Sequence, residues 1–286
     1  MKVISINPRG FCKGVNKAIK AVRAAVNSTT TKKPIYVIGY IVHNRFVVNE
    51  LTDLGVITLD DTVKTRLELV EEINSGTVIL SAHGTNPLVK ERLIEKNIDF
   101  IDATCEDVEK TFQLIKEYAA KGHHIFYIGK KNHPEANAAM SLTKDVTLIE
   151  TIEDIPENIL ENIFVTNQTT FSTLEIKGII DKIIENYPNT LVSEEICNAT
   201  RLRQKAIIDT NKDVDLCYIV GDPRSNNSKN LVYISESFTN TKTLLIQSVA
   251  DILEIDLLNI KTVSVSSGAS TPNYLTKEVI EFLKNY

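Results

Sequence analysis

The stretch DATCEDVEKTFQLI (Asp102–Ile115) ends a predicted strand, presents a cysteine and then opens a helical pattern of apolar residues. The same order surrounds two other cysteines, in RGFCKGVNKAI (Arg9–Ile19) and ICNATRLRQKAI (Ile196–Ile207). The three cysteines are almost equally spaced along the chain and are Cys12, Cys105 and Cys197. This spacing predicts a threefold internal repeat in which each unit carries one thiol.

Two further features recur at constant positions in the repeat. Each helix after a cysteine leads to a strand that ends in glycine, and a polar side chain follows four residues later. These pairs are Gly39 with His43, Gly129 with His133, and Gly221 with Ser225. A second strand in each third closes on a small polar loop, and the loops are SAHG (Ser81–Gly84), TNQTT (Thr166–Thr170) and SSGAS (Ser266–Ser270).

Short β-branched runs alternate with helical patterns along the chain, which is typical of an α/β fold with parallel strands. We expect three similar α/β lobes, over residues 13–104, 105–196 and 197–286. The third lobe has no strand of its own before a cysteine, and the N-terminal segment 1–12 supplies one, so the repeat is cyclic. It predicts a pseudo-threefold trefoil with the cysteines and polar loops around one central site, at the carboxyl ends of the strands.

Composition argues against several other classes of protein. The 286 residues are 43% hydrophobic, and 32 basic against 37 acidic residues give a formal charge of -5 without a basic run. Neither nucleic acid nor a membrane surface is therefore an expected partner. No segment has the length of a membrane span or the pattern of a signal peptide. Four cysteines without a CxxC pair indicate free thiols, metal ligands or nucleophiles in a reducing, cytoplasmic compartment.

Three thiols at helix N-termini around one axis favour a metal cofactor. A helix N-terminus lowers the pKa of a cysteine, and the thiolate is the form that binds metal. Structural zinc sites usually pair cysteines at CxxC spacing, whereas an iron–sulfur cluster on three cysteines would leave one iron open to substrate. Cys217 lies in the apolar run Leu216–Val220 and is better explained as a small buried hydrophobe.

The polar loops predict an anion site. His43 and His133 occupy matching positions of the repeat. In the second set of loops, the position of His83 matches those of Thr169, Thr170 and Ser270. Hydroxyls, imidazoles and backbone N–H groups near helix starts can bind phosphate without lysine. The alternative is that these residues only cap helices.

Glu135 is the acid that the repeat singles out. It lies two residues beyond His133 in HPE, on a loop expected to face the same cavity, where a carboxylic acid could deliver a proton. The alternative is a glutamate in the first turn of a helix, where the helix dipole favours negative charge.

Several ordered motifs together resemble one known family. They are RGFCKGVNKAI (Arg9–Ile19), SAHG (Ser81–Gly84), DATC (Asp102–Cys105), HPE (His133–Glu135), QTT (Gln168–Thr170), ICNAT with the following RQ (Ile196–Gln204), and GAS with the following proline (Gly268–Pro272). From Asn7 to Pro272, the chain resembles the 4-hydroxy-3-methylbut-2-enyl diphosphate reductases, the LytB or IspH family.

The resemblance implies a [4Fe–4S] cluster, with one iron not bound by cysteine, on residues matching Cys12, Cys105 and Cys197. It implies reductive dehydroxylation of (E)-4-hydroxy-3-methylbut-2-enyl diphosphate to isopentenyl and dimethylallyl diphosphates, the last step of the non-mevalonate (MEP) isoprenoid pathway. Reduced ferredoxin or flavodoxin would supply the electrons. The matching catalytic residues are Glu135, Thr169 and His133. The matching substrate-binding residues are His43, His83, His133, Thr169, Ser225, Asn226, Asn227 and Ser270.

Some positions depart from the usual family pattern. Glu106 replaces the customary proline after DATC, and Asn226 replaces a serine, which exchanges a phosphate-binding hydroxyl for an amide. Lys131 and Ala138 stand where the family has glycine-rich sequence around HPE. These departures bear on affinity more than on the type of reaction.

Two other functions would also explain the cysteines. A hydro-lyase would use the open iron as a Lewis acid without redox change, and conversion of substrate without a reductant would favour it. A cluster-based sensor or electron carrier would have no substrate, and a cluster spectrum insensitive to diphosphates would favour that. Neither explains the polar loops and HPE as well as a reductase does.

Overall fold

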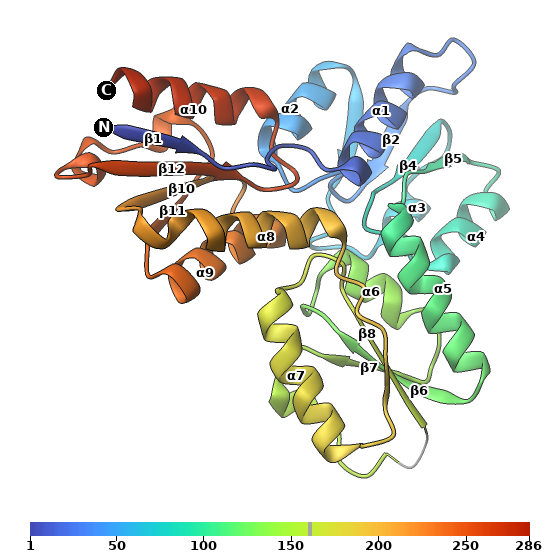
Figure 1. Cartoon of the computed structure of the whole chain (residues 1–286). Coiled ribbons are helices and arrows are strands. Elements are labelled where there is room, and N and C mark those ends of the chain that lie inside the picture. Colours follow the sequence, from blue (N-terminus) through green and yellow to red (C-terminus); the bar gives the residue numbers. More distant parts are fainter. Residues whose placement is uncertain (160–161) are drawn as a thin grey trace. The chain divides into compact units, whose positions relative to one another are not determined.

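The computed structural model describes residues 1–159 and 162–286. Its described strands form three sheets of four strands each, and all their pairings are parallel (Figure 1). Helices alternate with these strands along the chain. The predicted α/β class with parallel sheets is therefore confirmed.

The chain forms two compact units, and the first consists of Met1–Asn16, Val42–Val47 and Cys197–Tyr286. Its sheet has the strand order β1-β12-β10-β11, with β1 (Lys2–Ser5), β10 (Leu216–Val220), β11 (Lys242–Ile246) and β12 (Thr262–Ser267). Its helices are α8 (Asn198–Thr210), α9 (Asn226–Thr239) and α10 (Asn273–Asn285), with short 3-10 helices at Asn211–Asp213, Val249–Asp251 and Glu254–Leu257.

Both ends of the chain contribute to this sheet. β1 pairs with β12 in parallel register, from Lys2 opposite Thr262 to Ser5 opposite Val265. Figure 1 shows the two strands side by side, with the N-terminus beside the C-terminal helix α10. The cyclic repeat predicts this partner for the N-terminal strand. The boundaries of the three lobes stay a prediction.

A continuous apolar core explains why β10 and β12 form the centre of this sheet. All residues of β10, with the sequence LCYIV, are buried. Strands covered on both faces of a parallel sheet read as unbroken apolar runs of this kind. Leu216 and Tyr218 pack in one cluster with Val265 of β12 and with Leu275 and Val279 of α10.

The second unit consists of Lys17–Ile41 and Val48–Ile196 and contains two sheets. The strand order of one is β3-β2-β4-β5, with β2 (Ile35–Ile38), β3 (Val56–Leu59), β4 (Thr77–Leu80) and β5 (Asp99–Asp102). The order of the other is β7-β6-β8-β9, with β6 (His123–Ile128), β7 (Val146–Ile149), β8 (Asn162–Asn167) and β9 (Leu191–Val192).

The helices of the second unit are α3 (Arg66–Glu71), α4 (Pro87–Glu95), α5 (Glu106–Ala120), α6 (Pro134–Met140) and α7 (Thr173–Asn186), with a 3-10 helix at Ile152–Asp154. Helices α1 (Lys13–Asn27) and α2 (Arg45–Asp53) have residues in both units. Within residues 1–159 and 162–286, no helix is both long and apolar enough to cross a membrane.

One glycine hydrogen bond recurs in all three sheets. The glycine that follows β2, β6 or β10 donates its N–H to the last residue of the next strand in the chain. The pairs are Gly39 with Leu59, Gly129 with Ile149 and Gly221 with Ile246, with N···O distances of 2.8, 3.0 and 2.7 Å. The three turns therefore share one construction, and each leads to the polar residue four positions later.

Replacing Leu216 with alanine should lower the free energy of unfolding by about 2–5 kcal/mol, because this side chain is fully buried in the core of the first unit. Leu253→Ala is the matched control, since Leu253 is 59% exposed, and its effect should stay within about 0.5 kcal/mol. Urea denaturation of both variants measures the difference. Equal effects of the two substitutions would contradict the described core.

Candidate active site

Three half-buried cysteines each stand at the start of a helix. Cys105 is the N-cap residue of α5, and Cys197 is the N-cap residue of α8. Cys12 directly precedes α1, and its Sγ accepts a hydrogen bond from the N–H of Val15 at 3.4 Å. The predicted placement of these three cysteines at helix starts is therefore confirmed. Cys217 is fully buried in β10, and burial raises the pKa of its thiol.

An equivalent backbone hydrogen bond holds Cys12 and Cys105. The N–H of Cys12 donates to the C=O of Ala269 at 3.1 Å, and the N–H of Cys105 donates to the C=O of Ala82 at 3.0 Å. Ala269 lies in the GAS loop and Ala82 in the SAHG loop, which occupy matching positions in the repeat. Each of these cysteines is therefore fixed to one of the predicted polar loops.

In the first unit, a chain of hydrogen bonds joins two of the cysteines. From Cys12, the path continues through Ala269, whose N–H donates to Oδ1 of Asn227 at 2.8 Å. Nδ2 of Asn227 donates to Oγ1 of Thr200 at 3.4 Å, and this hydroxyl lies 3.2 Å from Sγ of Cys197. Asn227, predicted to bind substrate, thus lies between the two thiols in this network.

Four other predicted residues of the first unit lie together near the start of α9. Oγ of Ser270 lies 3.1 Å from the C=O of His43 and 3.3 Å from Oγ of Ser225. Ser225 is the N-cap of α9, and half-buried Asn226 is the first residue of that helix. Hydroxyl and amide groups beside a helix N-terminus are suited to binding an anion.

In the second unit, two predicted histidines pack against each other. The rings of His83 and His133 meet edge to face, with 5.5 Å between centroids. Nδ1 of His133 accepts the N–H of Glu135 at 3.2 Å. Because Nδ1 is the acceptor, the neutral His133 ring carries its proton on Nε2.

Glu135 lies among hydrogen-bond donors in the interior of the second unit. The residue is 1% exposed, and Oε2 accepts the hydroxyl of Thr169 at 2.9 Å. Oε1 accepts the N–H of Thr169 at 2.7 Å and the phenol of Tyr127 at 3.2 Å. Glu135 also lies in the first turn of α6, as the helix-dipole alternative predicts, but that alternative does not account for its burial or for its contacts with Thr169 and Tyr127.

Burial raises the pKa of Glu135 to about 7. The hydrogen bonds from Thr169 and Tyr127 oppose this rise, because they stabilise the carboxylate, and the nearby charge of Asp107 adds to it. A carboxyl group with this pKa is partly protonated near neutral pH. It can then give or take a proton, as a general acid must.

Helix capping explains only some of the predicted polar residues. Ser225 caps α9 and His133 caps α6. The helices that follow His83 and Thr169 are capped instead by Asn86 and Ser172. Capping therefore does not account for the polar side chains at His83 and Thr169, and the hydroxyl of Thr169 instead donates to Glu135.

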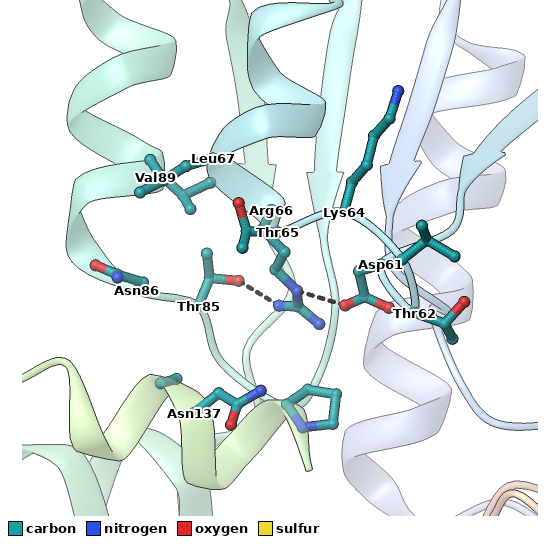
Figure 2. A pocket seen from close by; sticks show the side chains of 13 residues that line it. Asp61, Thr62, Lys64, Thr65, Arg66, Leu67, Thr85, Asn86, Val89 and Asn137 are labelled. Atoms are coloured by element: carbon teal, nitrogen blue, oxygen red, sulfur yellow. Dashed lines mark hydrogen bonds and ion pairs between the residues drawn. The ribbon is translucent and has the colours of Figure 1, made fainter. Parts of the chain in front are cut away.

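A cavity of about 460 Å³ lies beside the SAHG loop in the second unit (Figure 2). Arg66 projects into it, with Nε donating to Asp61 at 2.8 Å and Nη1 to the C=O of Gly84 and the hydroxyl of Thr85, both at 2.9 Å. Asp61 balances the charge of Arg66, and the guanidinium group of Arg66 supports the SAHG loop. The described lining of the cavity therefore does not present an uncompensated positive charge to a ligand.

Gly84 closes the SAHG loop with φ of +79°. A Cβ at this position would lie 2.5 Å from the ring of Phe112, so both the backbone conformation and the packing require glycine.

Comparison with known proteins places the chain in a family. A family model described as LytB protein matches residues 3–284. This chain belongs to the LytB family. A 4-hydroxy-3-methylbut-2-enyl diphosphate reductase from Geobacillus sp. (strain WCH70) is 47% identical over 292 residues, covering 100% of this LytB chain and 91% of that protein. A protein of the same name from Geobacillus kaustophilus (strain HTA426) is 46% identical with the same coverage.

Two solved structures are similar to this LytB chain. The E-1-hydroxy-2-methyl-but-2-enyl-4-diphosphate reductase from Plasmodium falciparum has a TM-score of 0.91 at 31% identity, with 99% of this chain and 88% of that chain covered. A structure of (E)-4-hydroxy-3-methyl-but-2-enyl diphosphate reductase, described as the terminal enzyme of the non-mevalonate pathway, has a TM-score of 0.69 at 29% identity, with both chains fully covered.

The departures of this LytB chain from the family pattern fall in ordinary structural settings. Glu106 is the exposed first residue of α5, where the helix dipole stabilises its charge. Ala138 is buried in α6, and Lys131 is exposed before that helix.

Sequence reasoning assigned no role to several residues that contact the site. Tyr127 lies within the apolar run of β6, so the sequence did not single it out, although a buried phenol usually has a hydrogen-bond partner. Thr200 could have been found from its position three residues after Cys197, because residues three apart on a helix are neighbours. Arg66 had no signal, since its contacts with the SAHG loop depend on the tertiary fold.

The ionisation of Glu135 predicts how stability depends on pH. The folded-state pKa of about 7 lies above the ordinary value of 4.5, so the folded protein holds this proton more tightly than the unfolded chain does. The contribution to stability is complete below pH 4.5 and is lost as pH rises through about 7, by about 3 kcal/mol in total.

Glu135→Gln removes this ionisation. Relative to the wild type, the variant should therefore become more stable on going from pH 5 to pH 8, as measured by anaerobic urea denaturation at both pH values. A stability difference that is the same at the two pH values would show that Glu135 ionises normally.

Proposed function

We propose that this LytB chain is a 4-hydroxy-3-methylbut-2-enyl diphosphate reductase. It removes the hydroxyl group of (E)-4-hydroxy-3-methylbut-2-enyl diphosphate reductively and forms isopentenyl and dimethylallyl diphosphates, in the last step of the non-mevalonate pathway. The observation that carries this proposal is the network of the first unit, in which a predicted diphosphate ligand, Asn227, is hydrogen-bonded to Ala269, the partner of Cys12, and to Thr200, the partner of Cys197. Relatives with this activity in their names cover the whole chain.

The proposed cofactor is a [4Fe–4S] cluster on Cys12, Cys105 and Cys197, with one iron not bound by cysteine. The donor set fits, because all three cysteines are half-buried at helix starts, where thiolates are stabilised, and Cys217 is fully buried elsewhere. When bound, such a cluster supplies electrons and an open Lewis-acidic iron. Reduced ferredoxin or flavodoxin is the proposed electron donor, and the reducing cytoplasm is the proposed compartment.

Each unit by itself contains proposed diphosphate ligands. In the first unit, the N-terminus of α9 is surrounded by the hydroxyls of Ser225 and Ser270 and the amides of Asn226 and Asn227. His43 is next to Ser270. Two predicted ligands of the second unit are His83 and His133. Nδ1 of His133 accepts the N–H of Glu135 in the helix that His133 caps, which fixes the imidazole at the start of α6.

Glu135 and Thr169 form the proposed path for a proton to the departing hydroxyl group. A protonated Glu135 can donate to Oγ1 of Thr169, which in turn releases its own hydroxyl proton toward the substrate, and their separation of 2.9 Å suits this transfer. Tyr127 holds the other carboxyl oxygen, so it positions Glu135 without meeting the substrate.

Serine substitution tests the three proposed cluster ligands. Each of Cys12→Ser, Cys105→Ser and Cys197→Ser should lose most of the iron and the visible absorbance of the anaerobically purified protein, because a hydroxyl is a poor ligand for iron–sulfur clusters. The control is Cys217→Ser, which should keep both. Retained iron in Cys105→Ser together with loss in Cys217→Ser would refute the assignment.

Anaerobic turnover with a chemical reductant tests the proposed reaction and its proton path. Glu135→Gln keeps the shape of the side chain but has no acidic proton, so its turnover should fall by about 10²–10⁴-fold. Thr169→Val should fall similarly, and the double variant should be no slower than the worse single one, since the two act in one path.

Tyr127→Phe is the control for position. It should keep turnover but move the pH profile to higher pH, because removing a donor to the carboxylate raises the pKa of Glu135. Full activity of Glu135→Gln would exclude Glu135 as the proton donor, and product formation without any reductant would favour a hydro-lyase instead.

A further inference from the structure

Arg203 in α8 is a buried cation between two of the proposed cluster ligands. The residue is 3% exposed. Nη2 donates to the C=O of Gly10 at 2.7 Å, and Nη1 donates to the C=O of Ala199 at 2.9 Å. Gly10 is two residues before Cys12, and Ala199 lies in the first turn of α8, two residues after Cys197, so one guanidinium group connects the loop of Cys12 with the helix start at Cys197.

The charge of Arg203 has no carboxylate partner among the described residues. Both hydrogen-bond acceptors are neutral carbonyl groups, and Nε has no partner in the described part of the chain. Burying an uncompensated charge costs several kcal/mol, so buried guanidinium groups are normally paired with an anion. Burial lowers the pKa of Arg203, and the charges of Cys12 and Cys197 are the influences that oppose this.

The anchor of Arg203 on the Cys12 loop is rigid. Gly10 has φ of +75°, and a Cβ there would lie 1.8 Å from Oδ1 of Asn273. Its N–H donates to Oγ of Ser267 at 2.8 Å. The carbonyl group that receives Arg203 is therefore held in one orientation by a turn that only glycine can form.

We propose that Arg203 is the fixed counter-charge of the iron–sulfur cluster, which it holds at a higher reduction potential by stabilising the added negative charge of the reduced state. This inference rests on the proposed cluster on Cys12 and Cys197. Reduction adds one electron to a site that already contains thiolates, and net charge and local hydrogen bonding set the potential of such clusters. Arginine suits the role because it cannot lose its proton in proteins and its planar fork reaches both carbonyls.

The test is an anaerobic redox titration of the intact holoprotein, followed by visible absorbance and electron paramagnetic resonance. Arg203→Gln removes the charge and keeps a hydrogen-bond donor. At a fixed applied potential, the ratio of reduced to oxidised cluster should fall about tenfold, which corresponds to a shift of about 59 mV for a one-electron couple. Lys205→Gln is the matched control, because Lys205 is exposed on the same helix and its loss should leave the ratio unchanged.

Arg203→Lys separates charge from shape. It keeps the positive charge, so its cluster should titrate close to the wild type. An unchanged potential in Arg203→Gln with full iron content would overturn the proposal. If Arg203→Gln assembles no cluster, the Arg203→Lys variant tests the proposal. A cluster in Arg203→Lys at nearly the wild-type potential supports the role of charge, and loss of the cluster from Arg203→Lys as well overturns the proposal.

The same titration distinguishes this inference from the proposed function. A wild-type protein that binds no iron–sulfur cluster would defeat the proposed function itself. A wild-type protein that binds the cluster and reduces the diphosphate, beside an Arg203→Gln variant with an unchanged potential, would defeat only the role of Arg203.

Discussion

The hydrogen bond from the N–H of Cys12 to the C=O of Ala269 joins a loop near the start of the chain to one near its end. It requires β1 to lie beside β12, because those strands deliver the two loops to the same edge of the sheet. Once this edge is formed, Asn227 can bind the other side of Ala269 and reach toward Cys197. The positions of two thiols and of the start of α9 thus depend on one strand pairing.

A buried ionisable side chain is stabilised in a different way in each of the two units. In the second unit, Glu135 can lose its charge by taking up a proton, and burial raises its pKa to about 7. In the first unit, Arg203 has no such option, since a guanidinium group stays protonated, so its compensation must come from an anion beside it. A carboxyl group that can gain and lose a proton is suited to proton transfer. A guanidinium group keeps its positive charge and is suited to a permanent electrostatic role.

The repeat in the sequence was enough to predict the parallel sheets, the helix starts at the cysteines and the pairing of β1 with β12. These features depend on local patterns, such as Gly221 and Ser225 with their constant offset, that recur three times in one chain. Tyr127 and Arg66 escaped prediction, because each acts on a segment that only the tertiary structure brings near. Capping and binding could not be separated either, since the sequence alone does not show that His133 caps α6 through Nδ1 whereas His83 caps no helix.

The sheet of the first unit draws β1 from the beginning of the chain and β12 from near its end. During synthesis β1 leaves the ribosome long before its partner strand β12, because more than 250 residues separate the two in sequence. The segment Lys2–Ser5 therefore cannot take its place in the sheet until β12 has been made. The loop of Cys12, which β12 and the following GAS loop hold in place, reaches its final form equally late.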